Sequence, residues 1–264
     1  MDYLLFITIP AAIVPSFILL WYFYSRDEYR EPPHLVIKTF LLGVLATGAV
    51  VLMGIPVKGL FARIQDPVLF SAVEAVLGAA VPEESMKMLV IVLYCMRKKD
   101  FNEMMDGLVY GAAASLGFAT LENVLYVNDG GLYSALIRAL TAVPGHAAMG
   151  VMMGYYLAKA RFGGDKKLYL LAWLVPVGFH AAYDFPLILQ MALKNVGELH
   201  PFLNLGLILG FVLILRIGLS AAINLFREVK SDQHEKRMEE IAQGVEESLN
   251  NEESNDVGGS SKTV

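Results

Sequence analysis

The chain has few charged residues and almost no cysteine, and both shortages exclude common classes of protein. Of its 264 residues, 18% are charged and 56% are hydrophobic, and the mean hydropathy is +0.52. Soluble domains carry about 25% charged residues. The single cysteine, Cys95, excludes a disulfide scaffold and every cysteine-based zinc motif. The composition therefore indicates an integral membrane protein.

Runs of basic residues are also short, which argues against nucleic-acid binding. The net charge is −5, and no run of Lys and Arg exceeds the three residues Arg97, Lys98 and Lys99. A protein that binds a phosphate backbone needs a concentration of positive charge. We therefore expect the lipid bilayer, and no nucleic acid, among the partners of this chain.

Long apolar stretches dominate what is present. Residues 3–25 contain no Asp, Glu, Lys or Arg, and a helix of that length crosses a hydrocarbon core of about 30 Å at ~1.5 Å per residue. Asp2 precedes this stretch and the first basic residue, Arg26, follows it, so a cleaved signal peptide is not expected. Seven such stretches cover residues 3–25, 35–57, 68–96, 104–127, 133–158, 168–193 and 201–226. We predict an all-α, polytopic transmembrane helix bundle with about seven spans.

The distribution of Lys and Arg between alternate loops predicts the orientation, because cytoplasmic loops carry an excess of basic residues. One set of loops holds eleven: Arg26, Arg30, Arg97, Lys98, Lys99, Lys159, Arg161, Lys166, Lys167, Arg227 and Lys230. The other set holds four: Lys58, Arg63, Arg138 and Lys194. This asymmetry favours an N-terminus outside and a C-terminus in the cytoplasm.

The last 34 residues differ from the rest, because residues 231–264 contain nine acidic and three basic side chains. Such a segment cannot bury enough apolar surface to offset its ordering entropy. We expect a transmembrane domain over residues 1–230 and an acidic, disordered cytoplasmic tail over residues 231–264. Within the tail, one stripe of a possible short amphipathic helix holds Met238, Ile241, Val245 and Leu249.

Several ionisable residues lie deep inside the apolar stretches. Each costs about 2.5 to 3.5 kcal/mol on insertion scales, so such residues usually face the bundle interior and mark a site. They come from the third to the sixth predicted span: Glu83, Glu84, Lys87, Glu122, His146, His180 and Asp184. Glu83 and Lys87, four residues apart, would neutralise each other in a purely structural role, but the whole set exceeds what neutralisation needs.

Helical spacing predicts that these side chains face neighbouring helices. In the fourth span, Glu122 shares a stripe with the small residues Gly107, Gly111 and Ser115, and small residues let helix backbones approach closely in lipid. Gly150 and Gly154 follow His146 at the same spacing, and His180 and Asp184 are one turn apart. We therefore expect the polar groups of four spans to meet in one cluster.

The chemistry of this set suits peptide-bond hydrolysis within the membrane. Two neighbouring carboxylates in a low-dielectric cavity do not both ionise at low cost, so one can take a proton from water and the other can return it. A histidine can stabilise the oxyanion formed when water adds to an amide, and Asp184 is placed to orient His180. The same residue types are zinc ligands, but the sequence contains no HExxH motif.

Five blocks of the sequence resemble the signature of the PrsW intramembrane proteases, in order over roughly residues 10 to 190. They are WYFYSRDEYREP at 21–32, EESMK at 83–87, GFATLEN at 117–123, His146 with residues 150–161, and HAAYDF at 180–185. The acidic tail lies outside this resemblance.

The resemblance implies an activity that the residues alone do not specify. PrsW proteases make the first, extracytoplasmic-side cut in a single-pass anti-sigma factor in the bacterial plasma membrane, and a sigma factor is later freed for a stress response. By motif, Glu83 and Glu84 would be the essential acidic pair and His180 the essential histidine. Glu122, His146 and Asp184 would support them. No cofactor is assigned, and a divalent metal such as zinc or a metal-free glutamic mechanism would both fit.

Three alternatives differ in class. The related CAAX prenyl proteases carry EExxxR and FxxxH, whereas here Lys87 lies four residues after Glu83 and Glu122 stands in the histidine position; we therefore favour the PrsW branch. A proton- or ion-coupled transporter would also bury such residues. A membrane scaffold would instead depend on residues 231–264.

Overall fold

The computed structural model describes the backbone of residues 2–259 and, within them, the side chains of all but residues 2–5, 58, 128, 129 and 249–259. This part of the chain is helical throughout its ordered elements and contains no strand, as predicted. The elements are α1 (Asp2–Arg26), α2 (Pro33–Phe61), α3 (Pro67–Val73), η1 (Glu74–Ala80), α4 (Val81–Leu93), η2 (Cys95–Arg97), α5 (Met104–Leu140), α6 (Ala142–Gly163), α7 (Lys167–Asn195) and α8 (Pro201–Gly259).

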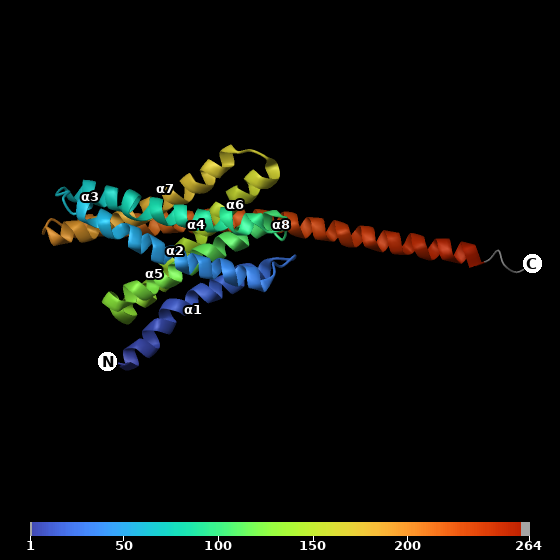
Figure 1. Ribbon diagram of the computed structural model, residues 1–264, viewed down its shortest axis with the longest axis horizontal. Coiled ribbons are helices and arrows are strands. Elements are labelled where there is room, and N and C mark those ends of the chain that lie inside the picture. Colours follow the sequence, from blue (N-terminus) through green and yellow to red (C-terminus); the bar gives the residue numbers. More distant parts are fainter. Residues whose placement is uncertain (1, 260–264) are drawn as a thin grey trace, which may run out of the picture.

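The helices run back and forth between two ends of an elongated bundle (Figure 1). One end carries the α2–α3 and α7–α8 connections and the turn within α5. The other end carries the α1–α2, α4–α5 and α6–α7 connections, and α8 projects beyond it. The second end holds the basic loops, so the positive-inside rule assigns it to the cytoplasm; this orientation stays a prediction.

Six helices of the described chain are long and apolar enough to cross a membrane. The predicted third span, residues 68–96, differs from them because it consists of α3, the π-helical segment η1 and α4 in succession. Asp66 caps α3 by accepting a hydrogen bond from the backbone N of Leu69 at 2.7 Å. Glu83, Glu84 and Lys87 lie on α4, so the least regular run of the bundle carries the acidic pair.

The centre of the bundle is a hairpin of α5 and α6. In the most apolar stretch of α5, 78% of the residues are buried, compared with 17% in that of α1. A Cβ on Gly107 would collide with the carbonyl of Gly154, and one on Gly111 with the carbonyl of Gly150. The two backbones are therefore in direct contact, as the spacing of small residues predicts.

The hairpin turns inside α5, at Gly131, whose φ of 60° and ψ of −153° lie outside the helical region. Such a conformation favours glycine because it has no Cβ. The chain then returns through residues 132–140, and a second break at Thr141 precedes α6. Arg138, which the basic-residue count assigns to a loop although the predicted stretch 133–158 contains it, therefore lies on a helix that runs antiparallel to the first part of α5.

The predicted tail continues α8. Residues 231–259 prolong this helix without a break, and Met238, Ile241 and Val245 are exposed. The side chain of Leu249 and residues 260–264 lie outside the described part of the chain. Gln233 is buried near the base of the projection. The boundary between domain and tail at residue 230 stays a prediction.

Candidate active site

Six side chains from four helices form one continuous chain of polar contacts. Glu122 Oε2 lies 2.7 Å from His146 Nε2, and Lys87 Nζ lies 3.0 Å from His146 Nδ1. Lys87 Nζ also donates to Glu84 Oε1 at 2.7 Å. His180 Nδ1 lies 2.8 Å from the same Glu84 oxygen, and His180 Nε2 lies 3.2 Å from Asp184 Oδ2. The structure thus brings together the side chains that the sequence predicts to form one cluster.

Lys87 is the junction of this chain. Its side chain is fully buried, and its ammonium lies 4.3 Å from the centroid of the Phe118 ring, a cation–π distance. Because an ammonium has only donors, His146 Nδ1 must accept, and the ring hydrogen is then on Nε2, where it is donated to Glu122. Lys87 thereby sets the tautomer of a histidine on another helix.

The two adjacent carboxylates have different surroundings. The Glu84 side chain is fully buried and contacts both Lys87 and His180. The Glu83 side chain is 12% exposed, and its Oε2 lies 3.6 Å from Lys87 Nζ and 3.9 Å from His180 Nε2. Among the described residues, this oxygen makes no hydrogen bond. The second oxygen of Glu84 likewise makes no hydrogen bond within the described residues, so the exposure of its side chain is what makes Glu83 the more accessible member of the pair.

A cavity of about 490 Å³ adjoins the chain of contacts. Its charged residues and histidines come from α4, α5, α6 and α7 and are Glu83, Glu122, Arg138, His146, His180 and Asp184, together with Glu74 of η1; the hydroxyl-bearing residues Tyr126, Thr141 and Tyr183 also line it. Apolar side chains such as Leu187, Ile188 and Met191 of α7 complete the wall. Glu84 and Lys87 do not line the cavity, so it contacts only part of the cluster directly.

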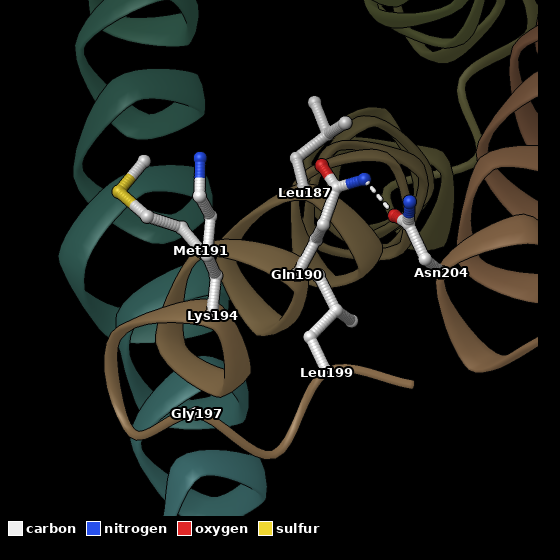
Figure 2. Close-up of a pocket in the computed structure, with 7 residues that line it drawn as sticks. All are labelled: Leu187, Gln190, Met191, Lys194, Gly197, Leu199 and Asn204. Carbon is white, nitrogen blue, oxygen red and sulfur yellow. Dashed lines mark hydrogen bonds between the residues drawn. The ribbon is translucent and has the colours of Figure 1, made fainter. Parts of the chain in front are cut away.

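A second hollow, of about 630 Å³, lies at the α7–α8 connection (Figure 2). Leu187 and Met191 line both this hollow and the cavity, so the two are neighbours along α7. Gln190 donates a hydrogen bond to Asn204 on α8 across the hollow. The α7–α8 connection, and so this hollow, lies at the end of the bundle that carries few basic residues.

Arg138 is the cavity residue that the sequence did not single out. Its Nη2 lies 2.9 Å from Glu122 Oε1, and its Nε donates to Asn123 Oδ1 at 2.7 Å. The guanidinium carbon lies 4.0 Å from the centroid of the Tyr126 ring. The count of basic residues in loops included Arg138, so it was not considered as a site residue. The helical stretch after Gly131, which returns alongside Asn123, was a sequence signal that could have identified Arg138 as a site residue.

The donor atoms of the cluster fit a divalent metal. Glu83, Glu84 and His180 offer ligand atoms within 4.8 Å of one another, and so do Glu83, Glu122 and His146. Glu83 belongs to both groups, and within the described residues Glu83 and Glu84 each have an Oε2 that makes no hydrogen bond. Carboxylates and imidazoles are typical zinc ligands.

Comparison with known proteins decides the family. The sequence model described as PrsW family intramembrane metalloprotease matches residues 31–217. The chain belongs to the PrsW family. The prediction from the five sequence blocks is thereby confirmed.

Curated relatives agree with this assignment. Protease PrsW of Bacillus subtilis is 40% identical over 185 residues, which cover 69% of this chain and 83% of the relative. Protease PrsW of Geobacillus kaustophilus is 39% identical over 189 residues, covering 70% and 81%. That of Oceanobacillus iheyensis is 34% identical over 216 residues, covering 81% and 97%. No solved structure matches the chain.

Membership in the PrsW family makes the chain a membrane protease, a hydrolase that acts in a lipid environment on a membrane-protein substrate. Its long apolar helices agree with a multi-pass protein of the bacterial membrane.

Proposed function

We propose that this PrsW protease makes the first cut in a single-pass, membrane-anchored anti-sigma factor, using Glu83 to activate water. The observation that carries the proposal is the chain of contacts from Glu122 to Asp184 beside one cavity. A purely structural set of ion pairs would not need a cavity lined by Glu83 and His180.

In the proposed reaction, Glu83 takes a proton from a water molecule in the cavity while the water oxygen bonds to the carbonyl carbon of the scissile peptide. The electron pair of the C=O bond moves to oxygen, and His180 Nε2, which lies 3.9 Å from Glu83 Oε2, turns its one hydrogen from Asp184 to that oxyanion. Collapse of the intermediate breaks the C–N bond. The leaving nitrogen takes the proton from Glu83, which restores the carboxylate.

The other members of the chain position these two groups. Glu84 and Asp184 hold the two ring nitrogens of His180 from opposite sides. Lys87 fixes Glu84 at 2.7 Å and neutralises one charge of the acidic pair. His146 lies 3.0 Å from Lys87, and Glu122 in turn fixes His146 at 2.7 Å. The sequence left the choice of base within the pair open, and the exposure of Glu83 favours Glu83.

If a metal takes part, Glu83 with either Glu84 and His180 or Glu122 and His146 would hold it. Such an ion would polarise the scissile carbonyl and lower the cost of forming hydroxide from water. Glu83 would then be a ligand, and its replacement would lower metal content together with activity.

The position of the second hollow supports a cut near the outer face. The cavity and the hollow share Leu187 and Met191, and the hollow lies at the end of the bundle that the basic residues assign to the outside. A substrate strand unwound near that face would reach Glu83 and His180 along α7.

The test is cleavage by purified protein in liposomes that also contain a single-pass anti-sigma factor. We expect two fragments, and Glu83→Gln should reduce their rate at least about 100-fold, the usual contribution of a positioned general base. Glu239→Gln makes the same chemical change at an exposed position of α8 and should leave the rate unchanged.

Three results would contradict the proposal. Full activity of a folded Glu83→Gln variant would exclude Glu83 as the base. Cleavage of other single-pass proteins but not of the anti-sigma factor would exclude the substrate. Proton flux into the liposomes without fragments would indicate a transporter instead. Assays with and without a chelator, combined with metal analysis, would separate the two mechanisms.

A further inference from the structure

A second cluster of carboxylates lies at the other end of the bundle, remote in sequence from the catalytic groups. Asp27 belongs to the α1–α2 connection, and Glu103 and Asp106 belong to the start of α5. One carboxylate oxygen from each of these three residues lies within 4.8 Å of the others. Glu31 extends the cluster, because its carboxylate accepts a hydrogen bond from Tyr110 at 2.5 Å.

Gln233 of α8 binds two of these carboxylates at once. Its Nε2 donates to Asp27 Oδ1 at 2.7 Å and to Glu103 Oε1 at 2.6 Å. Its Oε1 accepts from the backbone N of Glu28 at 3.1 Å. Gln233 is 2% exposed, so the amide connects α8 to α5 and to the α1–α2 connection inside the protein.

The cluster lacks neutralising charge. Within the described residues, no Lys, Arg or His nitrogen lies within 4.0 Å of a carboxylate of Asp27, Glu31, Glu103 or Asp106. Arg30 and Lys236 act only from farther away. Four neighbouring acidic groups without a cation are thus costly to ionise.

One carboxylate oxygen of the cluster lacks a partner within the described residues. The Asp27 side chain is 2% exposed, and its Oδ2 is buried and accepts no hydrogen bond from any residue that the structure describes. A buried carboxylate oxygen costs free energy unless it is paired. Oxygen atoms that share a Ca²⁺ or Mg²⁺ ion lie about 2.0 to 2.6 Å from it, so up to about 5 Å apart. The spacing of Asp27, Glu103 and Asp106 meets this condition.

We propose that Asp27, Glu103 and Asp106 bind one divalent cation of the oxygen-preferring class, Ca²⁺ or Mg²⁺. The three ligands are carboxylates, with no imidazole or thiolate, and this distinguishes the site from the zinc-type donors around His180. The cation neutralises the acidic cluster and fastens α8, through Gln233, to the start of α5 and the α1–α2 connection.

The test is direct cation binding by the full-length protein, freed of metals and kept in detergent. Terbium(III), a luminescent substitute for Ca²⁺, is titrated in with excitation of tyrosine and tryptophan, and Ca²⁺ and Mg²⁺ are then added as competitors. We expect saturable binding of one ion per chain that at least one of the two competitors reverses. Asp27→Asn and Glu103→Gln should each weaken binding at least tenfold, and Glu239→Gln, which neutralises an exposed carboxylate of α8, should not.

The titration is repeated in Glu83→Gln, which removes the ligand common to both donor groups of the active site. Retained binding in that variant assigns the ion to the acidic cluster. Loss of binding in Glu83→Gln, with retention in Asp27→Asn, would overturn the proposal, and so would the absence of saturable binding to the unaltered protein. The unaltered protein provides that last result even if Asp27→Asn fails to fold.

Discussion

Lys87 Nζ and His146 Nδ1 lie 3.0 Å apart and join α4 to α6 across the interior of the bundle. On its other side the same ammonium donates to Glu84 at 2.7 Å. A single buried cation therefore holds a carboxylate and an imidazole that come from different helices, and we expect both the stability and the activity of the protein to depend on it.

Replacing Lys87 with Met should destabilise the protein strongly. The change leaves Glu84 buried without its cation, and breaking a buried pair from one side typically costs about 3 to 5 kcal/mol. The double variant Lys87→Met with Glu84→Gln should recover much of the lost melting temperature, because no uncompensated charge remains. Thermal unfolding in detergent measures both. If the two single effects simply add, the pair is not coupled.

Replacing Arg138 should lower the turnover number more than it raises KM. Arg138 contacts Glu122 and Asn123 and reaches His146 only through Glu122, so we assign it a positioning role. We expect about a tenfold loss of kcat in Arg138→Met and a smaller loss in Arg138→Lys, which keeps the charge but not the planar fork. Arg63→Met, at an exposed position of the α2–α3 connection, is the control. A change confined to KM would indicate that Arg138 binds substrate instead.

In a buffer without divalent cations, the protein should lose stability as the pH rises from about 5 to about 7.5. Burial raises the pKa of Glu103 from 4.5 to about 7, and the pKa of Asp27 is raised as well. The folded state therefore holds protons that the unfolded state has already released, and this stabilisation disappears as the pH passes the folded value. Asp27 and Asp106 oppose ionisation of Glu103, while Gln233 and Lys236 favour it.

Melting temperatures measured across this pH range test the prediction. Glu103→Gln should flatten the profile, whereas Glu239→Gln should leave its slope unchanged. A profile that rises over the same range would contradict the sign of the argument.

Gly111→Leu should prevent correct assembly of the hairpin. The new side chain would meet the backbone of Gly150, which cannot move without separating α5 from α6. Gly206→Ala on α8 adds a methyl group where nothing lies within 4 Å, and it should be tolerated. Yield and melting temperature in detergent compare the two, and equal stability of both variants would contradict direct contact of the backbones.

The sequence was sufficient to predict the helical class and the meeting of Glu83, Glu122, His146 and His180, because charged side chains inside apolar helices must turn away from lipid. It was not sufficient for Arg138, because the basic-residue count treats it as a loop residue and the turn at Gly131 displaces the returning helix. It also did not single out Asp27 and Gln233. These two residues lie 206 positions apart, and no local pattern reports a contact of that kind.

The break of the predicted third span into α3, η1 and α4 was likewise not predictable in detail. Pro67 and Pro82 indicate possible bends in this stretch. The π-helical segment between them depends on packing against α7, which spacing along one helix does not reveal. The length of α8 beyond residue 230 was also not predictable. The acidic composition of residues 231–259 favours solvation and contains no signal for where the helix ends.

The contact between α5 and α6 limits how a substrate can approach from the side. Gly107 and Gly111 close this seam against Gly154 and Gly150, and within α5 the bond of Arg138 to Asn123 joins the first part of the helix to the returning residues 132–140. A transmembrane helix therefore cannot pass between α5 and α6 to reach the catalytic groups. Phe70 of α3, Ala79 of η1 and Ile188 of α7 line the cavity on another side, so we expect membrane-embedded substrates to enter from that side of the enzyme.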